Sequence, residues 1–560
     1  MSQSNFSSEC YLFEPATPHD NAIPVVFAFP NTYTVGITSL GYQTIWADLA
    51  MRPEVFVSRW FTDACEPLPR YPELLGFSFS WELDYVNILA ALEDLDIPIS
   101  SADRGGTHPI GNRPLVFGGG PVLTANPEPF ADWFDFILLG DGEELIGNML
   151  AAYQEVRHQP RQTQLRHLAQ VPGIYVPSLY AVSYECPEGA IATIQPIEPN
   201  IPTTITKQTY RGNTLSASTV VTAKAAWESI YMVEVARSCP EMCRFCLASY
   251  LTLPFRTPSA EGSLIPAIER GLKVTNRLGL LGASITQHPE FETLLDFISR
   301  SQFESVRLSL ASVRTNTLTL KLAQTLANRD SRSVTVAVES GSERLRQIIN
   351  KKLHNDEILQ AAVNAQAGGL SALKLYGMVG VPGEIDRDID ETVEMLRSLK
   401  KVAPKLRISF GCSTFVPKSH TPWQWMGVEK NADRKLKYLQ KQLAPKGIDF
   451  RPEGYKDSVI QALISRGDRR IQALLRLVYT YSGGAVPSDG MYKRAFKELR
   501  GQLPSLESYV HQEWARERVL PWQHLLGPLP VGKLIEHLEA SQHAIAKPTP
   551  TVPEMAVPVA

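Results

Sequence analysis

The chain has 560 residues, of which 44% are hydrophobic and 20% charged, and its formal net charge is −3. This length predicts about two or three domains, and this composition excludes a chain that is disordered throughout. Near neutrality gives no overall attraction to nucleic acid. Because the sequence has no long apolar run and no signal peptide in its polar first ten residues, we expect a cytoplasmic protein without a membrane span.

After an N-terminal segment (1–21), strands and helices alternate over residues 22–155. Helices of this length between strands predict a parallel, doubly wound sheet. Ligands bind such sheets at the carboxyl ends of the strands. Residues 31–36, 78–81 and 118–121 are expected at those ends.

A connector with a predicted hairpin (156–228) leads to a second alternating region, 229–425. Six successive strand–helix units predict a curved, incomplete barrel, with its chemistry at the carboxyl ends of the strands. A mostly helical region (426–544) follows, and the tail (545–560) is predicted to be disordered because it is rich in proline and small residues.

The first strand of the second region is followed by the loop RSCPEMCRFC, which contains Cys239, Cys243 and Cys246. Seven cysteines in a chain of this length are too few to indicate a disulfide framework. Three thiolates on one loop can hold three irons of a cubane cluster and leave the fourth iron open to a small molecule. A structural zinc site is the weaker alternative, because it needs a fourth ligand and the nearest histidine is His288.

The spacing C-x3-C-x2-C at the end of the first strand of a β/α partial barrel resembles the radical S-adenosylmethionine (SAM) superfamily. The resemblance implies a [4Fe–4S] cluster whose open iron is chelated by SAM. It also implies one-electron reduction that cleaves SAM to methionine and a 5′-deoxyadenosyl radical, which abstracts hydrogen from the substrate.

Later segments carry the same resemblance, since VAVESGSERLRQIINKK and LKLYGMVGVPGE are similar to the fourth-strand and fifth-strand motifs of the family. The sequence departs from the family after the second strand, where GASITQHPE replaces Gly-Gly-Glu. The matching motifs imply that SAM is contacted by Glu339, Ser340, Gly380, Pro382 and Gly383. In place of Gly-Gly-Glu, Ser284, Thr286 and backbone carbonyls are expected to serve, or the contact differs.

The first region is similar to the cobalamin-binding domain of the B12-dependent subgroup of this family. In that subgroup D-x-H-x-x-G follows the first strand, and its histidine binds cobalt. Here Asn31, Tyr33 and Gly36 stand at those places, and Gly118–Gly120 match glycines that flank the nucleotide tail. The domain is therefore predicted either to bind cobalamin without a protein ligand to cobalt or to serve as a scaffold that positions substrate.

Four further features of the sequence have both a structural and a functional interpretation. The charged cluster from Arg466 to Arg470 is predicted to form a solvated or salt-bridged face; the alternative is that it binds an anionic substrate. Cys412 is predicted to be a buried, inert thiol, although its side chain could face the barrel interior. The side chain of His420 is predicted to make a hydrogen bond within a loop; the alternative is a role as a general acid or base. His288 stands near the end of the second strand and could line the SAM pocket.

The sequence thus predicts a radical SAM enzyme of an uncharacterised, methylthiotransferase-like group, acting on an unknown substrate and reduced by a donor such as ferredoxin or flavodoxin. Transfer RNA methylthiolation is disfavoured, because neither a second three-cysteine set nor an RNA-binding barrel is visible. The alternative is a non-catalytic cluster-binding or assembly factor.

Overall fold

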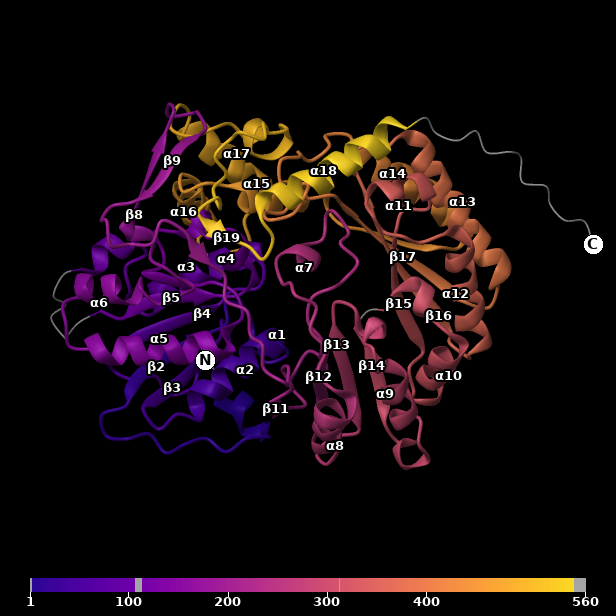
Figure 1. Ribbon diagram of the computed structural model, residues 1–560, viewed down its shortest axis with the longest axis horizontal. Coiled ribbons are helices and arrows are strands. Elements are labelled where there is room, and N and C mark those ends of the chain that lie inside the picture. Colours follow the sequence, from indigo (N-terminus) through magenta and orange to yellow (C-terminus); the bar gives the residue numbers. More distant parts are fainter. Residues whose placement is uncertain (1–2, 106–112, 312, 548–560) are drawn as a thin grey trace, which may run out of the picture.

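The computed structural model describes residues 3–105, 113–311 and 313–547. His108 and residues 548–560 of the predicted tail lie outside this part of the chain. Two α/β bodies lie side by side, with the N-terminal sheet on one side and the curved sheet of the second region on the other (Figure 1). C-terminal helices run along the top of both.

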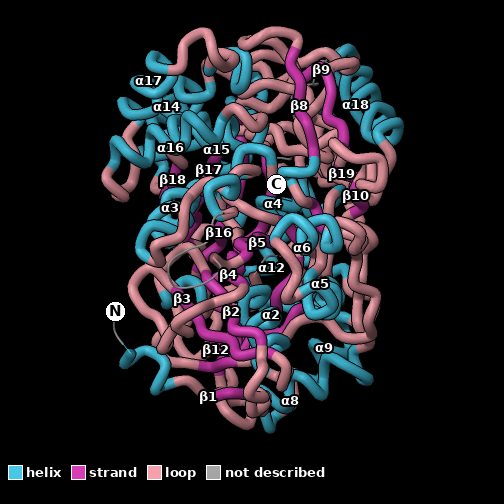
Figure 2. Tube along the Cα trace, turned by 90° about the vertical axis from the view of Figure 1, so that its left-hand side faces the viewer, coloured by secondary structure: helices cyan, strands magenta, loops and turns pink. Residues whose placement is uncertain are grey.

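The N-terminal body is built on a six-stranded sheet whose strands are parallel except the last. In spatial order the strands are β3 (Val55–Trp60), β2 (Ile23–Ala28), β4 (Leu74–Ser78), β5 (Leu115–Gly119), β6 (Phe136–Leu138) and β7 (Ile174–Tyr175). Figure 2 shows α5 (Gly142–Val156) and α6 (Arg161–Leu168) on one side of these strands and α3 (Tyr85–Asp94) on the other. The predicted doubly wound sheet is confirmed, and its central strands are apolar throughout because both of their faces are covered.

Short helices follow the strands of this sheet. After β2 the chain forms two helices, α1 (Tyr33–Gly36) and α2 (Leu40–Ala50), because Ser39 caps the second helix through its hydroxyl. Helix α4 (Pro121–Ala125) follows β5 directly. Each helix begins at the carboxyl end of a strand, where the ligand edge of the sheet lies.

A buried ionic cluster fixes the start of the chain to this sheet. Arg59 on β3 is fully buried and binds the carboxylates of Glu9 (2.7 Å) and Glu66 (2.7 Å). The hydroxyl of Tyr33 donates to Glu9 over 2.6 Å. The charges are therefore paired and hydrogen-bonded, as burial requires.

The second body is an open barrel of parallel strands in two hydrogen-bonded sheets. They are β12 (Ile230–Ala236), β13 (Arg277–Gly282) and β14 (Arg307–Leu310), then β15 (Ser333–Glu339), β16 (Ala372–Val379), β17 (Arg407–Thr414) and β18 (Asp449–Pro452). A parallel bridge from Val313 to Val336 continues the order from β14 to β15. The outer face carries α8 (Ile265–Leu272), α9 (Phe291–Ile298), α10 (Leu320–Asn328), α12 (Asn355–Ala367), α13 (Asp386–Val402) and α14 (Ala432–Leu443) (Figure 1).

The structure corrects the helical prediction for part of the C-terminal region and bears out the buried thiol predicted for Cys412. The barrel has a further strand, β18, which pairs with β17 inside the region predicted to be helical. Cys412 does not face the interior: it lies in the core between the sheet and the outer helices with Phe410 and Ile408. Alternation along β17 instead turns Gly411 and Ser413 inward.

Connecting and C-terminal elements join the two bodies. The predicted hairpin is formed by β8 (Tyr180–Tyr184) and β9 (Ile191–Pro196). Two small pairs, β1 (Cys10–Tyr11) with β11 (Val220–Val221) and β10 (Ile205–Thr206) with β19 (Leu525–Leu526), tie distant segments together. The remaining helices are α7 (Leu247–Tyr250), α11 (Glu343–Ile348), α15 (Tyr455–Arg466), α16 (Ile471–Ser482), α17 (Asp489–Glu498) and α18 (Val531–Ala546).

The charged cluster at 466–470 is internal packing. Arg466 is fully buried and donates to the carbonyls of Tyr509 and Val510. Arg469 pairs with Glu128 (2.9 Å), as Arg470 does with Asp468 (2.6 Å). These guanidinium groups are thus committed to the protein rather than to an anionic ligand. Among the described helices, none combines the length and the apolar character needed to cross a membrane.

The buried cluster of Arg59 yields a stability prediction. Replacing Arg59 by Met leaves the Glu9 and Glu66 carboxylates without their cation, which should cost about 3–5 kcal/mol of the free energy of unfolding. We expect a clearly lower thermal midpoint, whereas Arg52→Met, at a part-exposed pair with Asp48, should change it little. Equal midpoints for the two variants, measured by calorimetry, would contradict this role of the cluster.

Candidate active site

The cysteine loop leaves the barrel at the carboxyl end of β12 and lies between the two bodies. It begins after Ala236, and Cys246 is the residue from which α7 starts. Figure 1 shows α7 between the N-terminal sheet and the barrel strands. The loop therefore stands at the end of the barrel where such folds carry their chemistry.

Backbone in the left-handed region is concentrated in this loop and in the segments next to it. Ser238, Met242, Glu339, Asn350 and Lys352 all have φ between 48° and 73°. Each such non-glycine residue costs about 1–3 kcal/mol and persists only where its surroundings hold it. Strain of this kind clusters at functional sites, which marks this region as the candidate site.

The segment after α11 holds the cysteine loop in this conformation. The Asn350 side-chain amide donates to the carbonyls of Glu241 (3.2 Å) and Met242 (2.8 Å). The backbone N–H of Arg244 donates to the carbonyl of Ile349 over 3.0 Å. The thiol of Cys243 lies 3.8 Å from the carbonyl of Asn350. Sequence analysis missed Asn350, since its position has no recognisable spacing from the cysteines.

Helix α18 covers the same loop from the C-terminal end of the chain. The Arg244 guanidinium donates to the carbonyl of His537 (2.8 Å). Tyr250, at the end of α7, shares a hydrogen bond of 2.7 Å with the His537 ring. The loop is thus fixed from both sides by segments about 100 and 290 residues away in sequence.

The three cysteines are partly or fully buried in this loop. Burial raises the pKa of Cys243 to about 12 and also raises the pKa of Cys246. Bound iron deprotonates a coordinating thiol, so these thiols would ligate as thiolates. Among the described residues no three His, Cys, Asp or Glu side chains converge on one metal ion. A cubane cluster does not need that convergence, because each thiolate binds a different iron.

A buried ammonium group lies beside the cysteines. The Lys351 ammonium pairs with the Glu339 carboxylate over 2.9 Å, and both side chains are largely buried. Burial opposes the charge of Lys351, but Glu339 and Cys243 outweigh it and raise its pKa. Lys351, which sequence analysis missed, thus places a positive charge near the Cys243 thiol.

A second polar chain joins the cysteine loop to β13. Glu241, between the first two cysteines, pairs with Arg314 (2.9 Å) and accepts from the Gln287 amide (2.5 Å). The Ser284 hydroxyl donates to Gln287. Ser284 is therefore brought to the loop through Gln287 and Glu241.

The other predicted SAM contacts have packing roles in this structure. The Ser340 hydroxyl is buried and accepts from the N–H of Ser342 (3.1 Å). Gly380 has φ 74°, and a Cβ there would lie 3.2 Å from side chains of α14 and the residues before it. Gly383 has φ 83°, and its Cβ would meet Ile545 at 2.5 Å, so both glycines allow close packing. Pro382 lies between them. Contact of these residues with SAM stays a prediction.

Two histidines considered from the sequence are held in structural positions. Both ring nitrogens of His288 are engaged, one with the carbonyl of Pro258 (2.7 Å) and one with the N–H of Glu290 (3.0 Å). Burial lowers the pKa of His420 to about 4, so its ring is neutral at pH 7. Its ring is buried near Trp522, with ring centroids 6.4 Å apart.

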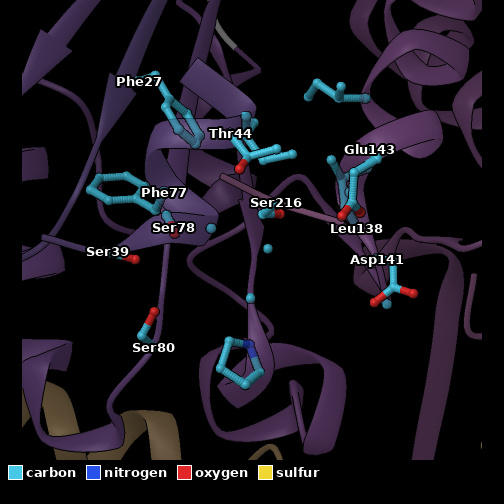
Figure 3. Close-up of a pocket in the computed structure, with 18 of the residues that line it drawn as sticks. Phe27, Ser39, Thr44, Phe77, Ser78, Ser80, Leu138, Asp141, Glu143 and Ser216 are labelled. Atoms are coloured by element: carbon cyan, nitrogen blue, oxygen red, sulfur yellow. The ribbon is translucent and has the colours of Figure 1, made fainter. Parts of the chain in front are cut away.

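A pocket opens at the carboxyl ends of the N-terminal strands. Its cavity volume is about 220 Å³, and the residues that line it are mostly small or apolar, with Asp141 and Glu143 at one side (Figure 3). The strands contribute Phe27, Phe77, Ser78, Phe117, Gly119 and Leu138 to the lining, and the segments that follow them contribute Ser39, Ser80, Gly120 and Gly142. The predicted ligand edge of the sheet therefore carries a real cavity, large enough for a single aromatic base.

Not every residue predicted for this pocket reaches it. Tyr33 is buried against Phe6 and Phe61, and its hydroxyl is bound to Glu9. Asn31 donates to Asp84 over 3.0 Å. Gly118 is packed against Leu123 and Phe134 rather than the cavity. None of the described histidines lines the pocket.

One arginine connects the pocket with the cysteine loop. Arg237, two residues before Cys239, lines the pocket and pairs with Glu143 (2.6 Å) and Asp141 (3.3 Å) at the start of α5. Asp141 also pairs with Arg256 (2.5 Å), whose backbone bonds back to Arg237. These ion pairs fix the N-terminal body against the start of the cysteine loop.

Comparison with protein families decides the assignment. Residues 233–396 match the radical SAM superfamily, and residues 41–177 match the family described as radical SAM proteins, N-terminal. The chain belongs to the radical SAM superfamily. It is therefore an enzyme of that superfamily, whose cofactors are a [4Fe–4S] cluster and SAM.

Individual relatives of this radical SAM protein are distant. It is 26% identical over 453 residues to an uncharacterised protein of Methanocaldococcus jannaschii, covering 80% of this chain and 90% of that one. It is 26% identical over 174 residues to an uncharacterised methyltransferase of Pyrococcus horikoshii, covering 30% and 37%. A solved radical SAM methyltransferase, TsrM from Kitasatospora setae with cobalamin and cluster bound, is 13% identical with a TM-score of 0.48, over 72% of this chain and 74% of that one. The cobalamin-dependent enzyme OxsB is 11% identical with a TM-score of 0.43, over 85% and 70%.

The cysteine loop generates a direct prediction. Anaerobically reconstituted protein should hold about four irons and four sulfides per chain, with the broad visible absorption of a cubane cluster. Replacing Cys239, Cys243 and Cys246 by Ala should abolish both iron and absorption, because no other described cysteine lies on the loop. The matched control Cys186→Ala, at an exposed hairpin cysteine, should keep the cluster. Stoichiometric zinc without iron would contradict the assignment.

Proposed function

We propose that Cys239, Cys243 and Cys246 hold the cluster and that the enzyme reductively cleaves SAM to act on a substrate by hydrogen abstraction. The observation that carries this proposal is the cysteine loop itself. It is strained, yet fixed by Asn350 and by α18, at the carboxyl end of the first barrel strand. In our proposal each of the three thiols on this loop binds a different iron of the cluster.

The charged groups around the loop match the charges of SAM. SAM presents an ammonium and a carboxylate at the end that chelates iron. In our proposal the Lys351 ammonium attracts that carboxylate, and the Glu339 carboxylate attracts the SAM ammonium or its ribose hydroxyls. Both side chains are largely buried, which strengthens these interactions relative to water. The electron comes from a cytoplasmic donor such as ferredoxin or flavodoxin.

We further propose that the N-terminal pocket receives the nucleotide tail of cobalamin. The pocket lies at the carboxyl ends of parallel strands, where ligands of such sheets bind, and its volume of about 220 Å³ suits one aromatic base rather than a whole corrin. Arg237 contributes to both the pocket and the start of the cysteine loop, so a cofactor seated there would face the cluster region.

Cobalt would have no strong ligand from this protein. Neutral imidazole is a good donor to transition metals, but the described histidines do not line the pocket. The phenol of Tyr33 is engaged with Glu9, and burial raises its pKa further, so it is a poor donor at pH 7. Bound cobalamin would be held by its tail and periphery alone.

Lys351 gives the sharpest test of SAM binding. In cluster-loaded protein, Lys351→Met should weaken SAM binding by about tenfold or more, the effect of losing one charge-assisted interaction. It should also lower the midpoint potential of the cluster, because a nearby positive charge favours the reduced state. Lys352→Met, the exposed neighbour, is the matched control. The role fails if both variants bind SAM as tightly as the unmodified protein.

Gly119 allows the pocket to be filled without straining the backbone. A Cβ at Gly119 meets only ordinary contacts at 3.7 Å, so Gly119→Leu should fold normally and occlude the pocket. Cobalamin binding, followed by visible absorption, should be lost in this variant and kept in Gly532→Leu, where a Cβ meets nothing within 4 Å.

The spectrum of bound Co(II) supplies an independent check. Paramagnetic resonance of the Co(II) form should lack nitrogen superhyperfine splitting, since no described histidine lines the pocket. Splitting that disappears when the exposed His19 is replaced would refute the absence of a histidine ligand. Absence of any cobalamin binding would leave the N-terminal body as a scaffold and the cluster assignment untouched.

A further inference from the structure

Three segments that are distant in the sequence meet around the cysteine loop. They are the loop with α7 (237–250), α11 with the turn after it (343–354), and α18 with the residue after it (531–547). The Arg244 guanidinium joins them, because it donates to the carbonyls of Ile348 (2.6 Å) and His537 (2.8 Å). Helix α11 also packs against α18 (Figure 1). Together the segments form one continuous surface beside the cysteines, the cluster face.

Positive charge is concentrated in the three segments of the cluster face. They contain eight Lys and Arg residues but four Asp and Glu residues, whereas the whole chain has 55 and 58. The cluster face therefore has an excess of positive charge in a chain whose formal net charge is −3. Charge gathered in this way produces a field that attracts a partner of opposite sign.

The carboxylates of these segments do not cancel that excess, since each one already pairs with a cation. The pairs are Glu241 with Arg314 (2.9 Å), Glu343 with Arg346 (3.8 Å), Glu536 with Lys533 (2.7 Å) and Glu539 with Arg516 (2.8 Å). Within the described part of the chain, Arg244 donates only to carbonyl oxygens, and the exposed Lys352 makes no ion pair. The charges of these two residues are therefore available to a partner.

The turn after α11 separates two neighbouring lysines. Asn350 and Lys352 have φ of 60° and 48°, so the chain bends sharply on both sides of Lys351. The Lys351 ammonium turns inward to Glu339 (2.9 Å) and is near the Cys243 thiol, whereas Lys352 is exposed. A partner that binds Lys352 is therefore brought close to the cysteines without entering the site.

The ring of His537 on α18 marks the point where the cations of the cluster face meet. Burial lowers the pKa of this ring, and the positive charge of Arg244 lowers it further. Lys533 and Lys352 act in the same direction, while Glu536 opposes them. One ring thus senses a cation from each of the three segments, which places the three cations together on one surface.

Protein encloses the cysteine loop on its other sides. Arg237, at its start, pairs with Glu143 of the N-terminal body (2.6 Å), and Glu241 is bound by Gln287 from the segment after β13 (2.5 Å). Lys352 and Lys533 are exposed, by contrast. The cluster face is therefore the side from which another protein can approach the loop.

We propose that the cluster face binds a small acidic electron-carrier protein, whose carboxylates are attracted by Arg244, Lys352 and Lys533. This inference rests on the proposed function, in which such a carrier reduces the cluster. In that step one electron passes from the carrier to the cluster, so the carrier is oxidised by one electron, the cluster is reduced by one, and no bond forms or breaks. Complexes of this kind are small and weak, and complementary charge mainly accelerates their formation, so a few available cations are enough.

The test measures binding of oxidised flavodoxin, an acidic electron carrier, to cluster-loaded, full-length protein by calorimetry at low ionic strength. The double variant Lys352→Glu, Lys533→Glu should bind about tenfold more weakly than the unmodified protein, because two attractive charges become repulsive. Added salt should weaken binding to the unmodified protein and reduce this difference. The single variant Lys352→Glu, which leaves α18 unchanged, should show a smaller loss in the same direction.

The matched control reverses two lysines on the outer helices of the barrel. Lys401 on α13 is exposed, and Lys437 on α14 pairs with Asp433 of its own helix, as Lys533 does with Glu536. The double variant Lys401→Glu, Lys437→Glu has the same net charge as the test variant and should bind flavodoxin as the unmodified protein does. Equal affinities of the two double variants would overturn the proposal. So would an unmodified protein that binds neither flavodoxin nor an acidic [2Fe–2S] ferredoxin.

Reduction by dithionite separates this inference from the proposed function. Dithionite is a small ion that needs no docking surface, so with dithionite the Lys352→Glu, Lys533→Glu variant should form 5′-deoxyadenosine at the unmodified rate. With reduced flavodoxin its rate should fall about tenfold, and an unchanged rate would contradict the proposal. If dithionite yields no 5′-deoxyadenosine from the unmodified protein, the proposed function fails, and the binding titration still decides whether the cluster face binds the carrier.

Discussion

The candidate site depends on the conformation of the cysteine loop, which contacts from other parts of the chain stabilise. Ser238 and Met242 adopt left-handed backbone within the cysteine loop, which costs about 1–3 kcal/mol for each residue. The segment after α11 offsets that cost through Asn350, and α18 adds the contact of His537 with Arg244. The positions of the three thiols therefore depend on contacts from segments that are distant in the sequence. This requirement explains why the C-terminal helices, far from the cysteines in sequence, belong to the functional unit.

A second constraint sets one body against the other. Arg237 stands at the start of the cysteine loop, and Asp141 and Glu143 hold it from the N-terminal body. These ion pairs are largely buried, so they are less screened by salt than surface pairs. Arg237 thus joins the N-terminal pocket, which it lines, to the cysteine loop, which begins two residues after it.

Much of this could be predicted from the sequence. Alternating strands and helices predicted both α/β bodies, and the cysteine spacing predicted a cluster-binding loop, which the structure places at the carboxyl end of β12. The rest depended on tertiary contacts that leave no local pattern. Strand β18 is short and contains a proline, so neither period nor composition separates it from a loop. Lys351 and Asn350 are ordinary residues after a helix until the fold brings them to the cysteines. Tyr33 stands at the expected place in the sequence, but its side chain turns toward Glu9, which residue order alone cannot reveal.

The measurement that tests the central claim most directly is the formation of 5′-deoxyadenosine. Anaerobic, cluster-loaded protein is reduced with dithionite in the presence of SAM, and the products are separated by chromatography. The account predicts 5′-deoxyadenosine and methionine from the unmodified protein and neither from the variant that lacks Cys239, Cys243 and Cys246. A protein with an intact, reducible cluster that forms no more 5′-deoxyadenosine than this variant would contradict it.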